Sequence, residues 1–168
     1  MKVTALEEYG LRCMVELARR WDDDRAVTIS EIAEAEGISD ANAGKLLLIL
    51  RKTGLVEAER GRNGGYRLTR SPEYIQLSEI LEALGEPVYS QDHCSRFASD
   101  DNGSCVHAED CVIRVVWQDL RYLVGSVLEG VSLHTLAAGK YQRLKPGVTK
   151  KRSDELRKNK SLINHLEL

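Results

Sequence analysis

The first part of the chain holds apolar positions at helical spacing, interrupted by polar turns. A capping box, Thr4-x-x-Glu7, comes first, in which the hydroxyl group caps a free amide and the carboxylate reaches back. The apolar stripe behind this box consists of Leu6, Cys13, Met14, Leu17 and Trp21. Because these residues fall on one helical face, the pattern predicts an amphipathic helix that ends at the acidic turn 22–24.

Two further helices are predicted after this turn. A second capping box, Thr28-x-x-Glu31, begins a short helix, and Gly37 ends it because glycine adopts a left-handed conformation without steric strain. Ser39 then caps a third helix of about 40–53. The apolar residues of this third helix are Leu46, Leu47, Ile49 and Leu50. Helices two and three, joined by a short turn, have the order of a helix-turn-helix motif.

A basic hairpin follows the third helix. A short strand over 55–59 and a returning strand over 66–68 flank the glycine-rich segment 60–65. Its Asn63-Gly64 pair is a strong hairpin signal, because a tight turn needs positive φ at its centre. The sequence therefore predicts a fold that is mainly α with a small β-hairpin wing, a winged helix-turn-helix.

In the second half of the chain, the sequence pattern predicts a long helix through which two copies of the protein dimerise. A short helix over 76–84 is followed by a segment, 85–110, with little apolar periodicity. In the next helix, about 111–129, apolar residues step by four and three as in a coiled coil. These seam residues are Ile113, Trp117, Leu120, Val124 and Val127. A short apolar turn over 131–138 comes after this helix.

This pattern divides the chain into three parts. We expect residues 1–75 to form a winged helix-turn-helix DNA-binding domain, and residues 76–139 to contain a loop with three cysteines and the dimerisation helix. Residues 140–168 form a basic tail that we expect to be mobile. No run of about 18 apolar residues occurs and the N-terminus lacks a signal stretch, so we expect a cytoplasmic protein.

The net charge of −2 argues at first against nucleic acid, but the charges are unevenly placed. Residues 45–70 hold seven basic and two acidic side chains, and residues 140–168 hold nine basic and three acidic ones. Phosphate binding needs a local positive face rather than a basic protein. Double-stranded DNA is therefore the predicted partner. The alternative is a helical protein-interaction domain with an ordinary solvated basic face.

Several residues are placed to contact DNA. The second helix of a helix-turn-helix lies in the major groove, and its early residues contact base edges. Asparagine pairs with adenine and lysine with guanine acceptors, whereas arginine on a thin hairpin is attracted into the minor groove. We expect Lys52 to contact phosphate only. The complete predicted set is Ser39, Ala41, Asn42, Lys45, Lys52, Arg60 and Arg62.

Three of the four cysteines crowd together at Cys94, Cys105 and Cys111. Their spacing differs from that of zinc fingers, which favour two-residue gaps within each half. Thiolates are the usual ligands of iron–sulfur clusters, normally four per cluster, so a fourth ligand must come from elsewhere. The alternatives are free structural thiols, or zinc bound with His93 or His107. Cys13 lies on the apolar stripe of the first helix and is interpreted as a buried small hydrophobe.

A set of short motifs resembles a known family, the Rrf-type winged-helix transcription regulators that include IscR and NsrR. The resemblance extends from the N-terminus to about residue 139. The motifs that carry it are Met1-Lys2-Val3-Thr4, Tyr9-Gly10-Leu11-Arg12, Gly37-Ile38-Ser39, Leu50-Arg51-Lys52-x-Gly54-Leu55-Val56 and Arg60-Gly61-x-x-Gly64-Gly65-Tyr66. It implies a homodimeric regulator whose three-cysteine loop holds an iron–sulfur cluster and whose long helix makes the dimer.

The chain departs from this family pattern near the cluster. The gap between the first two cysteines is longer than is usual in IscR and NsrR. IscR-like members have a histidine ligand three residues after the last cysteine, but this chain has Arg114 at that position. RsrR-like members have a histidine ligand in the first helix, but this chain has Arg12 there. NsrR-like members use a first-helix carboxylate from the partner subunit, and Glu8 matches that position. Glu8 is thus the fourth-ligand candidate; the alternative is an ordinary first-turn carboxylate favoured by the helix dipole.

The resulting hypothesis is a dimeric regulator, not an enzyme, that binds a near-palindromic operator. An iron–sulfur cluster, [4Fe-4S] in preference to [2Fe-2S], sets its DNA affinity in response to iron–sulfur status, redox state or a reactive gas. The alternatives are a cluster-free thiol-based regulator and a protein-interaction module that does not bind DNA. An iron–sulfur enzyme is disfavoured, because no nucleophile–base set is apparent and segment 61–65 lacks the Lys-Ser/Thr of a phosphate loop.

Overall fold

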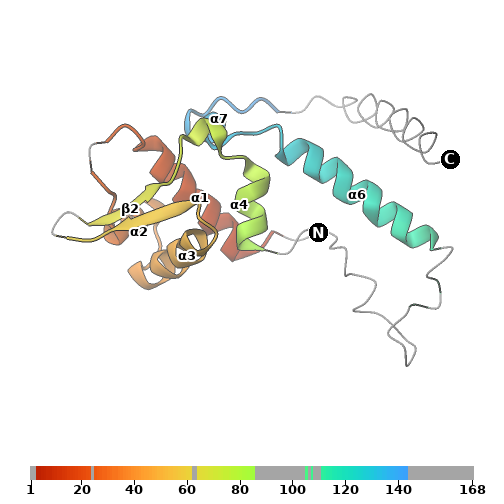
Figure 1. The fold of residues 1–168 in the computed structure, drawn as a ribbon, viewed down its shortest axis with the longest axis horizontal. Helices are drawn as coiled ribbons and strands as arrows, with labels where there is room; N and C mark the ends of the chain where they lie inside the picture. Colours follow the sequence, from red (N-terminus) through yellow and green to blue (C-terminus); the bar gives the residue numbers. More distant parts are fainter. Residues whose placement is uncertain are drawn as a thin grey trace.

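Helix α1 (Ala5–Arg19) runs through the middle of the N-terminal half of the protein, and the neighbouring elements pack around it (Figure 1). The computed structural model describes residues 3–23, 25–61, 64–85, 105, 107 and 111–143. The predicted capping box is present: the backbone N–H of Glu7 donates to Thr4 Oγ1 at 3.2 Å, and Glu7 Oε2 accepts from the Thr4 backbone at 2.7 Å. Local hydrogen bonds therefore fix the start of α1.

The apolar stripe of α1 is shorter than predicted. Cys13, Met14 and Leu17 are buried as expected, but Leu6 is 38% exposed and Trp21 is 39% exposed. The helix ends at Arg19, so Trp21 lies beyond it in a turn and does not continue the helical face. The prediction that Trp21 belongs to the helical stripe was wrong, whereas Leu6 lies within α1 as predicted but has an exposed side chain.

The helix-turn-helix is formed by α2 (Ile29–Glu36) and α3 (Asp40–Lys52). The capping box of Thr28 and Glu31 begins α2, and Gly37 ends it with φ of 64°, as the sequence predicted. The hairpin consists of β1 (Val56–Glu59) and β2 (Gly65–Leu68), paired antiparallel with Val56 opposite Leu68. These elements confirm the winged helix-turn-helix fold.

Two short helices beyond the wing complete the core. Segment η1 (Pro72–Tyr74) leads into α4 (Leu77–Leu84), and α7 (Leu133–Ala137) packs against α1 and η1. The predicted apolar turn 131–138 is thus largely helical. Leu133 is fully buried, and its backbone N–H donates to the Ile75 carbonyl at 2.8 Å.

A single set of buried side chains joins these elements into one core. The largest of them are Met14, Ile32, Leu47, Leu50, Ile75, Ile80, Leu133, Val56 and Cys13. They come from α1, α2, α3, β1, α4, α7 and the segment before α4. The core therefore holds the recognition helix and the base of the wing in a fixed relation.

Helix α6 (Val112–Leu128) extends away from this core, at the opposite end of the molecule from the wing (Figure 1). None of its residues is buried. Ile113, Trp117 and Leu120 are 66%, 40% and 40% exposed. Within the described ranges, no helix combines the length and apolar character that a membrane crossing requires.

Candidate DNA interface and cysteine site

Helix α3 buries one apolar face and presents the predicted base-contacting residues on the other. Its buried residues are Ala43, Leu46, Leu47 and Leu50. Ala41, Asn42 and Lys45 are exposed on the first turns, and Lys52 is exposed at the end. The arrangement leaves the predicted residues free to meet a groove, because the core holds only the opposite face of the helix.

The first turn of α3 is held by side-chain hydrogen bonds. Ser39 Oγ accepts from the backbone N–H of Asn42 at 3.3 Å, as an N-cap does. Ser30 Oγ donates to Asp40 Oδ2 at 2.6 Å and links the starts of α2 and α3. Ser39 thus has a structural role, and its contact with a base stays a prediction.

The wing depends on two adjacent glycines. A β-carbon at Gly65 would overlap the carbonyl oxygen of Val27 and lie 2.6 Å from its carbonyl carbon. At Gly64, a β-carbon would lie 2.6 Å from the carbonyl oxygen of Glu59. Backbone atoms cannot move aside as a flexible side chain can, so both positions require glycine. Close contact between backbones therefore explains why both of these residues are glycine.

Backbone pairing fixes the wing to the loop after α1. The N–H of Val27 donates to the carbonyl of Tyr66 at 2.9 Å, and the N–H of Tyr66 donates back at 2.7 Å. Arg67 Nε lies 2.9 Å from Glu59 Oε1 across the hairpin. Arg60 is exposed at the hairpin tip, and Arg62 lies outside the described residues. Val27 thus holds β2 beside the turn of the hairpin, and Arg60 lies exposed just beyond this contact.

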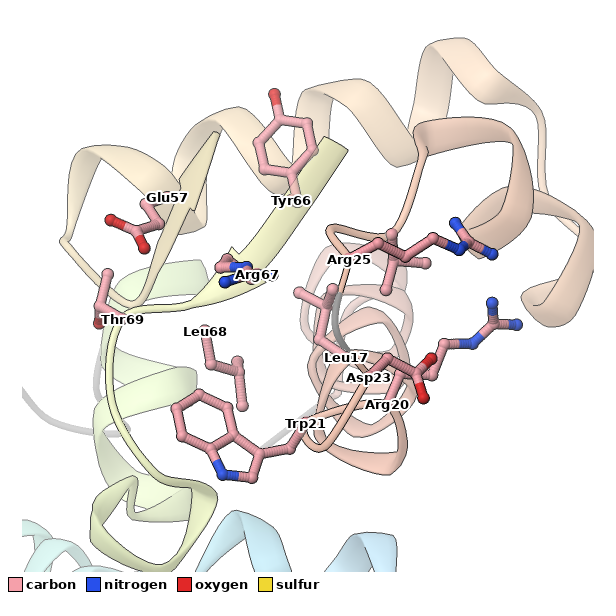
Figure 2. A pocket seen from close by; sticks show the side chains of 11 residues that line it. Leu17, Arg20, Trp21, Asp23, Arg25, Glu57, Tyr66, Arg67, Leu68 and Thr69 are labelled. Carbon is pink, nitrogen blue, oxygen red and sulfur yellow. The ribbon is translucent and has the colours of Figure 1, made fainter. Parts of the chain in front are cut away.

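A pocket of about 300 Å³ lies between the end of α1 and β2. Figure 2 shows Trp21 and Leu68 on one side of it, whereas the guanidinium groups of Arg20 and Arg25 point away from them. Arg25 NH1 donates to Glu31 Oε2 at 2.9 Å, and its NH2 lies 2.5 Å from Glu31 Oε1. Because both arginines are held in ion pairs, we assign them a structural role.

These ion pairs form a network between α1 and α2. Arg20 lies 2.8 Å from the nearly buried Glu16 and 3.6 Å from Glu31. Hydrogen bonds from Arg25 and from the backbone and hydroxyl of Thr28 hold the pKa of Glu31 well below its usual range. Glu31 therefore stays ionised and serves both as a cap and as an ion-pair partner.

The cysteines lie in two different environments. Cys13 is fully buried, and desolvation raises the pKa of its thiol to about 11. Cys105 and Cys111 are half-buried free thiols. Cys111 is the N-cap residue of α6, where its Sγ accepts from the backbone N–H of Arg114 at 3.4 Å. Cys94 lies outside the described residues.

Glu8 is exposed on the first turns of α1 and is already paired. Its Oε1 accepts from Arg12 Nε at 2.8 Å and NH2 at 2.6 Å. The guanidinium carbon of Arg12 lies 5.5 Å from the centre of the Tyr9 ring. The i, i+4 spacing of Glu8 and Arg12 is the sequence signal for this ion pair.

His107 is exposed, and the described ranges hold no group of three potential metal-binding side chains.

The geometry defines a class of protein. A capped helix-turn-helix with an exposed, basic recognition helix and a basic hairpin beside it makes a winged-helix DNA-binding protein. Comparison with known proteins then gives the family. The chain belongs to the Rrf2 family, whose model, described as an iron-dependent transcriptional regulator, matches residues 3–139.

Named relatives agree with this assignment. The HTH-type transcriptional regulator IscR of Aliivibrio salmonicida is 32% identical over 136 residues, which cover 81% of this chain and 77% of IscR. The solved structure of IscR from T. potens is similar with a TM-score of 0.64 and 26% identity, covering 88% of this chain and 94% of that one. The structure of CymR, titled the global cysteine regulator of B. subtilis, has a TM-score of 0.64 and 28% identity, covering 82% and 97%. The family and these relatives are transcription regulators, not enzymes.

Proposed function

We propose that this protein is a homodimeric regulator whose operator affinity depends on an iron–sulfur cluster held by Cys94, Cys105 and Cys111. The observation that carries the proposal is the position of Cys111. It caps the helix whose apolar face is exposed, so a group bound there would lie at the start of the dimer contact. The description of the family as iron-dependent supports the same conclusion.

The residues present suit such a group. Cys105 and Cys111 are free thiols, and Cys111 stands at the N-terminus of α6. Thiolates are the usual iron–sulfur ligands, and the cluster would supply sensitivity to oxidants, reactive gases or iron supply. We prefer [4Fe-4S] over [2Fe-2S] because the proposed ligands are three thiolates and one oxygen.

The fourth ligand in this proposal is the partner subunit's Glu8. A carboxylate is a hard ligand that is displaced from iron more easily than a thiolate is. In the single chain Glu8 is bound to Arg12, so it must leave that ion pair to bind the cluster. Arg12 therefore competes with the cluster for Glu8. Loss of the bond between Glu8 and the cluster would alter how α1 is held beneath the recognition helix.

The dimer is proposed to form along α6. The seam residues Ile113, Trp117 and Leu120 are exposed in the single chain, and Val124 and Val127 are partly exposed. Burying a large apolar side chain contributes about 1.5–3 kcal/mol. We keep the division into a winged-helix part, 1–75, a cysteine and dimer part, 76–139, and a basic tail, 140–168. Residues 131–137 pack on the first part. A two-fold dimer presents two equal DNA-binding heads, so its operator should be a near-palindrome.

The DNA contacts are proposed as follows. Asn42 and Lys45, with Ser39 and Ala41, meet base edges in the major groove. Lys52 meets phosphate. Arg60 and Arg62 enter a minor groove from the wing. Exposure of the described members supports these roles.

A second candidate function is a cluster-free thiol regulator. The structural likeness to CymR, titled a global cysteine regulator, favours it, as do the free, half-buried thiols of Cys105 and Cys111. In that case oxidation of these thiols, not a metal group, would change DNA affinity. The protein-interaction alternative without DNA binding has less support, because the relatives are named HTH-type transcriptional regulators.

The test is anaerobic purification followed by absorption spectroscopy and iron and sulfide counts. We expect a coloured protein with bound iron and sulfide, and each of Cys94→Ala, Cys105→Ala and Cys111→Ala should lose both. Cys13→Ala is the matched control and should lose neither. A colourless, iron-free protein whose DNA binding responds to thiol oxidation would favour the second candidate.

The role of Glu8 needs a separate comparison. Operator binding is measured for cluster-loaded and cluster-free protein, in wild type and in Glu8→Ala. We expect Glu8→Ala to keep a more labile cluster and to lose the difference in DNA affinity between the two forms. If the variant retains the full wild-type difference, Glu8 is not the fourth ligand, and His93, His107 or solvent becomes the candidate.

A further inference from the structure

The outward face of α3 includes two residues, Gly44 and Leu48, that the predicted DNA contacts leave out. Ala41, Gly44, Lys45 and Leu48 follow one another at i, i+3, i+4 and i+7, so they share one helical face. Leu48 is 46% exposed, although it lies between the buried Leu47 and the partly buried Ile49. Lys45 and, one turn beyond Leu48, Lys52 are charged residues on this face. Leu48 therefore contributes little to the core and instead shapes the surface that faces a groove.

Gly44 lies within this face, where a glycine weakens a helix relative to alanine. A β-carbon at Gly44 would meet only Ile29 Cδ1, at 3.8 Å, which is an ordinary van der Waals contact. The fold thus has room for a side chain at this position. Because Gly44 has no side chain, another molecule can approach the helix backbone beside Lys45 and Leu48.

The hydrogen-bonding groups at the start of α3 are partly engaged. Ser39 Oγ accepts the capping bond from Asn42, and Asp40 accepts a hydrogen bond from Ser30. The middle of the helix therefore offers apolar contact more than hydrogen bonds. Basic residues lie at its end, Arg51 and Lys52, both exposed. A partner with negative charge along its edges and apolar groups between them would complement this surface.

We propose that Leu48, together with Ala41, contacts the 5-methyl groups of thymines in the major groove, and that Gly44 permits the close approach. Among the four bases only thymine presents a methyl group there. Leu48 is thus a specificity-determining residue, and the operator carries thymines opposite the middle of α3. This inference rests on the proposed DNA interface, which it extends to an additional type of base contact.

The test uses DNA duplexes selected from a random-sequence pool by the full-length wild-type protein. Each thymine of a selected duplex is replaced in turn by deoxyuridine, which removes only the methyl group. For the wild type we expect a loss of about fourfold in affinity at one or two positions per half-site, the effect of one buried methyl. Leu48→Ala should bind the unmodified duplex more weakly and should lose nothing further on deoxyuridine at the positions opposite Leu48.

Matched variants make the outcome decisive. Tyr74→Ala removes an exposed apolar side chain outside α3 and should bind all duplexes as the wild type does. Gly44→Ala should fold at least as stably, yet bind the selected duplex more weakly. The proposal is overturned if Leu48→Ala shows the same deoxyuridine losses as the wild type, or if Gly44→Ala binds unchanged. If Lys45→Ala and Arg60→Ala also bind unchanged, the DNA interface itself is misplaced, and Leu48 faces another partner.

Discussion

Gly65 in the wing lies against the carbonyl group of Val27 in the loop after α1, with no space between them for a β-carbon. This contact brings the two backbones close enough for the paired hydrogen bonds of Val27 and Tyr66. The wing is consequently positioned by a segment that directly precedes the helix-turn-helix. Contact between these two residues connects the two DNA-binding elements.

Gly65→Ala should therefore detach the turn end of β2 from the loop after α1. The methyl group would force the backbones apart and break both hydrogen bonds between Val27 and Tyr66. We expect a loss of about 1–3 kcal/mol in stability and a similar loss in operator affinity as Arg60 moves away. Denaturant unfolding and an electrophoretic mobility-shift titration measure the two effects. Glu57→Ala, an exposed change on the neighbouring strand, is the control and should show neither effect.

The wing and α3 should contribute to binding in different ways. Arg60→Ala should weaken binding to a specific operator by about 1–3 kcal/mol, as expected for a lost groove contact. Lys52→Ala should weaken binding to specific and to random DNA alike. It should also reduce the salt dependence of binding, because a protein with one phosphate contact fewer releases fewer counterions when it binds. Titrations at several salt concentrations on both DNAs check this. Equal losses for both variants on both DNAs would contradict the division of roles.

The seam on α6 should be required for dimerisation. Replacing Leu120 and Val124 together with glutamate places charge on the exposed apolar face, and burying an unpaired charge is strongly unfavourable. We expect monomers in sedimentation analysis and weak operator binding, since one head makes half the contacts. Gln118→Glu lies on another side of the same helix and should leave the dimer intact. An unchanged dimer in the double variant would place the interface elsewhere.

Stability should fall at acid pH through Glu31. Its pKa is lower in the folded protein than in the unfolded chain, so its contribution is present above the unfolded value of about 4.3. That contribution is lost as the pH falls below this value towards the lowered folded pKa. Denaturant unfolding from pH 7 downward should show a weaker acid dependence for Glu31→Gln than for the wild type. Glu34→Gln, exposed on the same helix, should retain the wild-type dependence.

Cys13 should be unreactive in the folded protein. Burial excludes reagents and raises the thiol pKa to about 11, so little thiolate forms at neutral pH. In cluster-free protein, iodoacetamide should modify Cys105 and Cys111 and leave Cys13 intact, as measured by peptide mass spectrometry. Denaturant should make Cys13 reactive. Modification of Cys13 at the same rate in folded protein would contradict its assignment to the core.

Some of the site was open to prediction from the residues. The exposed recognition residues and the basic tip of the wing follow from helical spacing and charge. The ion pair of Glu8 and Arg12 also has a sequence signal, their i, i+4 spacing. The exposed position of Leu48 was harder to predict, because an apolar residue in an amphipathic helix usually joins the buried face.

The sequence by itself determined the order and the ends of the helices. Capping boxes at Thr4 and Thr28 and the left-handed Gly37 act within a few residues, so neighbouring side chains decide them. The tertiary structure decided what depends on residues far apart in the chain. Leu133 enters the core beside Ile75, and Gly65 meets Val27, only after the chain has folded back on itself. Such contacts leave no periodic signal in the sequence, because they depend on the packing of whole elements and not on local backbone preference.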